Sequence, residues 1–151
     1  MNVYSSYFLP AGIGTIAHRN NNPLNIRRVT SNNWVGRDTS YQGAFERFLT
    51  TTFGVRAGIV LLRTYHRNGF RTISQIINRF APPVGMRPDG TMYPNNTQNY
   101  INFVVSRSGF GVNQVLEFNA RTYFPVISAM CRFESQFVLS ESDFATAWAL
   151  T

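Results

Sequence analysis

The stretch HRNNNPLNIRR, His18 to Arg28, holds four asparagines and three arginines around a single proline. It is too polar to belong to a core, and Pro23 stiffens its backbone. Amide side chains both donate and accept hydrogen bonds. The stretch therefore predicts an ordered polar loop over residues 18–32, whose asparagines either cap backbone groups of the loop itself or hold a ligand.

The segments on either side of this loop predict an irregular arm and a β-hairpin. Residues 1–17 include an apolar run that proline and glycine interrupt, with no basic residue ahead of it, so we expect an N-terminal arm and no signal peptide. Asn33 to Thr50 is rich in turn-forming residues in its middle, which indicates a hairpin between Trp34-Val35 and Ala44 to Leu49.

The rest of the chain mostly shows the helical spacing of apolar residues. The predicted helices cover Val55 to Tyr65, RTISQIINRF at 71–80, TQNYINFVVSRSG at 97–109, Thr122 to Gln136, and a last segment that begins at Ser140. Thr72 and Gln75 fit a capping box. Ala81 to Asn96, with four prolines and two glycines, predicts a loop. The sum is a single, mainly helical α+β domain over residues 18–151 with one small hairpin.

Composition narrows the class of protein. A chain of 151 residues is long enough for one domain with its own core. No apolar run approaches the roughly 20 residues that cross a bilayer, so we expect no membrane span.

The single cysteine, Cys131, excludes an internal disulfide; its neighbours favour a buried thiol, with a nucleophile as the alternative. His18 and His66 lie far apart without carboxylates at ligand spacing, so we assign no metal and no cofactor.

The charge of the chain points to an anionic partner. The net charge is +7, and all 14 basic residues are arginines, whose planar guanidinium groups match carboxylates and phosphates. They are spread along the chain, which predicts a broadly basic surface that would attract a bacterial cell wall, a membrane surface or nucleic acid. Nucleic acid is disfavoured, because the arginines do not cluster with aromatic residues in a known binding signature.

Only seven side chains are acidic, which limits the choice of a catalytic acid. Glu134 lies late in the predicted helix 122–136, and its neighbours one and two turns earlier are apolar. A carboxyl at the edge of an apolar stripe is partly desolvated, which raises its pKa and suits it to donate a proton. The alternative is a surface glutamate paired with Arg132 or Arg121.

Two further carboxylates are candidates for a second role. Glu46 lies on the second strand of the predicted hairpin, and Asp38 lies near its turn. For each of them, the alternative is a solvated side chain on the strand or turn.

Most of Arg19 to Gly109 resembles a family of phage virion-associated muralytic proteins of the lytic transglycosylase or muramidase type. The resemblance rests on the blocks RNNNPLNIRR, NNWVGR, GAFERF, FGVRAGIVLLRTY, TISQIINRFAPP and NNTQNYINFV. It implies a lysozyme-like fold, peptidoglycan glycan strands and other virion proteins as partners, and a place in the virion or at the bacterial wall. Relatives usually have Gly where Leu24 stands and Trp where Phe80 stands.

Bacterial cell-wall glucosaminidases and goose-type lysozymes are similar at a greater distance. They carry a helix ending in Glu-Ser, then an Asn-rich loop, then a Trp-x-Gly hairpin. Here NNPLNI and NWVG look like the second and third parts, while FESQF at 133–137 looks like the first. We therefore infer a circularly permuted lysozyme-like domain, in which Glu134 lies beside the Asn-rich loop in space.

These resemblances imply cleavage of a β-1,4 glycosidic bond, with Glu134 as the acid that protonates the leaving oxygen. If Glu46 or Asp38 lies roughly 6.5–9.5 Å from it, that carboxylate would activate water and give inversion. If neither does, Glu134 would act alone, first as acid and then as base on the sugar's own hydroxyl, giving an anhydro product.

Amides and aromatic rings are the expected substrate contacts. The candidates are Asn22, Asn25, Trp34, Tyr93 and Tyr100. The alternative for the tyrosines is ordinary packing, and for the asparagines it is backbone capping. A non-catalytic virion or wall-binding protein with the same fold is the alternative for the chain as a whole.

Overall fold

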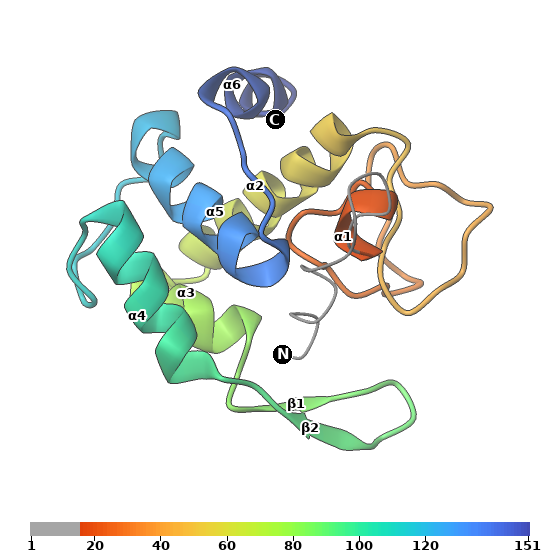
Figure 1. The fold of residues 1–151 in the computed structure, drawn as a ribbon, viewed down its shortest axis with the longest axis horizontal. Coiled ribbons are helices and arrows are strands. Elements are labelled where there is room, and N and C mark those ends of the chain that lie inside the picture. The colour runs from red at the N-terminus through yellow and green to blue at the C-terminus, as the bar shows by residue number, and fades with distance from the viewer. Residues whose placement is uncertain (1–15) are drawn as a thin grey trace.

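The computed structural model describes residues 16–151, which form a mainly helical α+β domain (Figure 1). Six helices and one antiparallel pair of strands follow one another along the described chain. Their bounds are α1 Ile16–Arg19, α2 Thr51–Arg67, α3 Ile73–Phe80, β1 Val84–Met86, β2 Met92–Pro94, α4 Thr97–Ser108, α5 Ala120–Ser135 and α6 Glu141–Ala149. The predicted fold class is confirmed at this level; most of the predicted N-terminal arm lies outside the described residues.

Four helices, α2, α3, α5 and α6, begin where a capping side chain satisfies a free backbone N–H group. The predicted capping box is present at α3, where the Thr72 hydroxyl accepts from the Gln75 N–H and the Gln75 side chain accepts in return. At α6 the Ser140 hydroxyl accepts a hydrogen bond from the Asp143 N–H, without a reciprocal bond. Asn119 caps α5 and starts it two residues earlier than predicted, which moves Pro125 from the first turn into the second.

The hairpin lies in a different place from the predicted one. β1 and β2 occur within the proline-rich segment predicted to be a loop, because its Pro-Asp-Gly-Thr sequence makes a tight turn. The Asp89 carboxylate accepts hydrogen bonds from the Thr91 N–H and hydroxyl, at 2.9 and 2.6 Å. Gly90 supplies the positive φ of 88° that the turn requires. Figure 1 shows this hairpin projecting beyond the ends of α3 and α4.

Residues 33–50, predicted to be the hairpin, contain two isolated bridges and no regular strand. One bridge pairs Arg37 with Phe48 within the segment, while the other pairs Phe45 with Arg27 of the Asn-rich loop. The segment divides its backbone hydrogen bonds between itself and that loop, so neither pairing extends into a ladder. This division holds the Asn-rich loop in a fixed position.

Two glycines let the Asn-rich loop lie directly against α2. A Cβ on Gly54 would stand 1.8 Å from the Asn21 carbonyl oxygen, and one on Gly58 would stand 2.6 Å from the Leu24 side chain. Leu24 is 1% exposed, so it seals this contact. Elsewhere in the core α5 packs against α4, and α6 packs on α2. No helix within residues 16–151 is long and apolar enough to cross a membrane.

Candidate active site

A cleft of about 530 Å³ opens between the Asn-rich loop, the hairpin and the helices α2, α3 and α5. Its lining combines aromatic rings, amides and arginines with a single carboxyl group. The lining side chains discussed below are Asn25, Arg27, Phe45, Tyr65, Arg79, Phe80, Arg87, Tyr93, Asn95 and Glu134. Clefts of this size, with a few polar groups among apolar walls, are typical of ligand sites.

Glu134 lies in the last turn of α5, against the Asn-rich loop. The Asn25 side-chain amide donates to the Glu134 backbone carbonyl at 3.3 Å. The Ser135 hydroxyl donates to the Pro23 carbonyl at 2.9 Å. These bonds join segments more than 100 residues apart in sequence, and they confirm the predicted proximity of the Glu-Ser pair and the Asn-rich loop.

Burial keeps the Glu134 side chain in its neutral form. Desolvation raises its pKa from 4.5 to about 8, while a hydrogen bond from Tyr100 and the charge of Arg27 act in the opposite direction. Glu134 is 4% exposed, and this small exposed part faces the cleft. A buried carboxyl that holds its proton near neutral pH can serve as a general acid.

Tyr100 supports this carboxyl from behind the cleft wall. It lies in α4, is 1% exposed, and stacks on Phe133 with ring centroids 4.0 Å apart. This packing fixes the Tyr100 hydroxyl, which lowers the pKa of Glu134 against the effect of burial. The structure therefore places Tyr100 as a positioning residue for the carboxyl rather than as a wall of the cleft.

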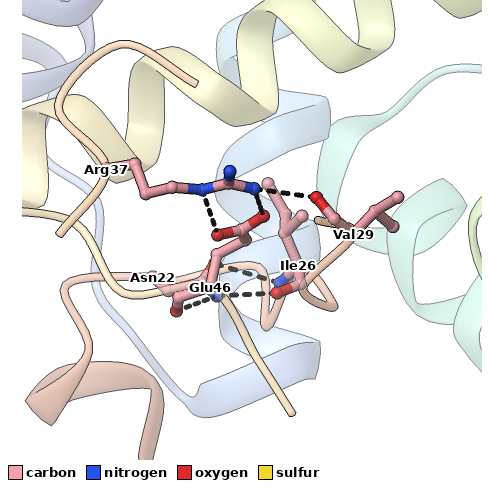
Figure 2. A network of polar contacts seen from close by, with 5 residues as sticks. All are labelled: Asn22, Ile26, Val29, Arg37 and Glu46. Atoms are coloured by element: carbon pink, nitrogen blue, oxygen red, sulfur yellow. Dashed lines mark hydrogen bonds and ion pairs between the residues drawn. The ribbon is translucent and has the colours of Figure 1, made fainter. Parts of the chain in front are cut away.

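Glu46 is buried too, but it is paired and lies away from the cleft lining. The Arg37 guanidinium donates hydrogen bonds to both carboxylate oxygens of Glu46, at N–O distances of 2.9 and 2.5 Å. Arg37 also donates to the Val29 carbonyl (Figure 2). A charged carboxylate with a bidentate arginine is held as a structural ion pair. Asp38 lies on the surface, where hydrogen bonds from Ser40 lower its pKa.

The two asparagines predicted as ligands have different roles. The Asn22 side chain is fully buried and donates to the Ile26 and Glu46 carbonyls while it accepts from the Ile26 N–H (Figure 2). Asn22 therefore holds the loop together and does not line the cleft. Asn25 lines the cleft in a left-handed conformation with φ of 50°, and its buried side-chain oxygen has no donor among the described residues.

Of the two other predicted aromatic contacts, one reaches the cleft. Tyr93, on β2, lines it and accepts a hydrogen bond from Arg27 at 3.1 Å. Trp34 is half-buried against the core outside the cleft lining.

The arginines of the cleft were missed by sequence reasoning. Arg27 lies over the Tyr93 and Phe45 rings, at 4.6 and 4.9 Å from their centroids. Arg87 lies 5.0 Å from the Tyr93 centroid and Arg79 lies 5.5 Å from the Tyr65 centroid. Fourteen arginines spread over the chain gave no local signal for these three, since the cleft assembles them from three separate segments.

No group of three His, Cys, Asp or Glu side chains within residues 16–151 could hold a metal ion. Cys131 is buried, as predicted, and burial raises the pKa of its thiol, so it is not a nucleophile. The chemistry available in the cleft is therefore that of one neutral carboxyl surrounded by cations, amides and rings.

Fold and cleft together define a mainly helical α+β protein with a protonated carboxyl at the wall of a basic, aromatic cleft. No protein-family model matches the chain. It is similar to Protein P5 of Pseudoalteromonas phage PM2, with 41% identity over 121 residues that cover 78% of this chain and 69% of the phage protein. The chain therefore belongs to the family of this phage protein.

Proposed function

We propose that this protein cleaves the β-1,4 glycan strands of peptidoglycan, as a lytic transglycosylase or a muramidase-like hydrolase with a permuted lysozyme-like fold. The observation that carries the proposal is Glu134, a carboxyl with its pKa raised to about 8 that faces a ligand-sized cleft. Glycosidic cleavage requires a proton donor of this kind at the leaving oxygen.

The distribution of carboxylates favours the transglycosylase reaction. All seven acidic side chains of the chain fall within residues 16–151, and Glu134 alone among them lines the cleft. Glu46 is bound by Arg37, and neither Glu46 nor Asp38 is among the cleft-lining residues, which supports a reaction that uses Glu134 alone. Glu134 would protonate the glycosidic oxygen and then, as the carboxylate, accept the proton of the sugar's own hydroxyl. The C–O bond that forms closes an anhydro ring and replaces the one that breaks.

The other cleft residues match the substrate's groups. Asn25 and Asn95 both lie in the cleft lining, and amide side chains of this kind can accept the N–H of an acetamido group. The Phe80 ring offers a flat apolar surface for a sugar face. The relationship to a phage protein supports a role in the virion or at the host wall, with other virion proteins as neighbours.

The test is digestion of purified peptidoglycan by the parent protein, by Glu134→Gln, and by Glu117→Gln as a matched control. Glu117 is exposed and lies outside the cleft lining. We expect Glu134→Gln to lose about 10²–10⁴-fold in rate, the usual worth of a general acid, and the control to retain the parent's rate. Mass spectrometry should find anhydro ends in the parent digest.

Other results would change the proposal in defined ways. Reducing muramic acid ends would identify hydrolysis, and reducing glucosamine ends would identify a glucosaminidase. Wall binding with no cleavage by the parent would indicate a non-catalytic virion or wall-binding protein. Equal cleavage rates for Glu134→Gln and the parent would show that Glu134 is not the catalytic acid.

A further inference from the structure

We propose that Arg27, Arg79 and Arg87 form a carboxylate-binding subsite in the cleft, so that the protein prefers glycan strands bearing anionic substituents to neutral ones of the same length. The inference rests on the proposed function for its substrate and adds the charge that the substrate must carry at this site. Two groups on peptidoglycan supply carboxylates: the lactyl ether of muramic acid and the stem peptides attached to it.

No described carboxylate forms an ion pair with any of the three arginines, and Asp89 of the hairpin turn interacts with Arg87 only at longer range. Within residues 16–151 one ion pair occurs, between Arg37 and Glu46, and it lies outside the cleft lining. Glu134, the single carboxyl of the cleft, is neutral at pH 7 because its pKa is about 8. The cleft therefore carries a net charge near +3 before a ligand enters, and its arginines gain most from an anionic ligand.

Stacking holds these guanidinium groups without using up their donors. The Arg79 guanidinium lies over Tyr65 and makes no hydrogen bond to another described group. Arg27 uses its Nε to bond Tyr93, and Arg87 uses one terminal nitrogen to bond the hairpin turn. A ring contacts the face of a guanidinium, while a carboxylate binds its edge, so both contacts are possible at once.

The arrangement also links binding to the proton on Glu134. The charge of Arg27 lowers the pKa of this carboxyl, against the larger effect of burial. A carboxylate bound at Arg27 would cancel part of that charge. An anionic substrate would thus help Glu134 to keep its proton until transfer, whereas a neutral one would not.

Binding measurements in the Glu134→Gln background test the subsite without turnover. The ligands are uncrosslinked glycan fragments with stem peptides, the same fragments after amidase removal of the peptides, and N-acetylglucosamine oligomers of equal length. We expect the peptide-bearing fragments to bind at least about 10-fold more tightly than the neutral oligomers, since a charge-assisted contact contributes about 1.5–3 kcal/mol. The amidase-treated fragments identify the source: a retained preference assigns it to the lactyl carboxylate, and a lost one to the stem peptides.

The double variant Arg79→Gln/Arg87→Gln should abolish this preference, and Arg107→Gln should leave it intact. Arg107 is a matched control, because it is exposed and lies 5.3 Å from the Phe103 centroid outside the cleft lining. Equal affinity for charged and neutral ligands, survival of the preference in the double variant, or an equal loss in Arg107→Gln would overturn the subsite. Cleavage by a parent protein without the preference refutes the subsite alone, whereas the preference without any cleavage refutes the proposed function alone.

Discussion

The neutral state of Glu134 predicts that the protein loses stability as pH rises. A group whose pKa is higher in the folded protein than in the unfolded chain binds its proton more tightly when folded. Below the unfolded pKa of 4.5 the carboxyl is protonated in both states, so it does not change the folding free energy. As pH rises from 4.5 to the folded pKa of about 8, the carboxyl ionises in the unfolded chain only, and this increasingly favours unfolding. Because of Glu134, the free energy of unfolding therefore falls as pH rises between these two values.

The size of the effect follows from the two pKa values. Raising a pKa from 4.5 to about 8 corresponds to about 5 kcal/mol, or about 1.4 kcal/mol per pH unit within the window. From pH 5 to pH 8 the free energy of unfolding should fall by about 4 kcal/mol, which corresponds to roughly 8–16 °C in Tm for a domain of this size.

The assay is urea or thermal unfolding of the parent and of Glu134→Gln between pH 5 and pH 9. His18 and His66 also titrate in this range, with pKa values lowered by burial, so they favour stability as pH rises. Both proteins contain them, and the difference between the two curves therefore isolates Glu134. Parallel curves, with a difference that stays constant within about 1 kcal/mol, would show that Glu134 ionises freely in the folded protein.

Three further substitutions test the framework of the site through the free energy of unfolding. Arg37→Met should cost about 3–5 kcal/mol by leaving a buried charge on Glu46, and adding Glu46→Met should recover most of the loss. Asn22→Ala should cost about 2–3 kcal/mol, because it leaves buried backbone groups unpaired; a loss below about 0.5 kcal/mol would contradict its role in the loop. Gly54→Ala should destabilise despite the roughly 1 kcal/mol gain in helix propensity, because its Cβ would meet the Asn21 carbonyl; higher stability would refute that contact.

The helices could be predicted from the sequence, because their signals are local. Apolar spacing located α2 to α5, and Thr72 and Ser140 marked the starts of α3 and α6 through caps that need only the next three residues. The hairpin could not be placed in this way. The Pro-Asp-Gly-Thr turn that forms it stands among prolines that usually mark loops, and residues 33–50 pair partly with the Asn-rich loop.

The proximity of Glu134 to the Asn-rich loop could be predicted from the order of its motifs, whereas the surrounding charges could not. A Glu-Ser pair at the end of a helix is a short motif that can be recognised even when it stands at a different position in the sequence. Arg27, Arg79 and Arg87 come from a loop, a helix end and a hairpin. Only the packing of those three segments brings them together, and no pattern within one segment reveals it.

The two buried glutamates show why burial alone does not identify an acid. Glu46 is 1% exposed and Glu134 is 4% exposed, so both have left water almost completely. Glu46 has a bidentate arginine that compensates its negative charge, and its carboxylate serves as an acceptor that ties Arg37 to the loop. Among the described residues Glu134 forms no ion pair, and the effect of the Tyr100 hydroxyl on its pKa is too small to offset the cost of desolvation. The absence of a paired cation among the described residues, at a position that lines the cleft, is what leaves Glu134 protonated near neutral pH.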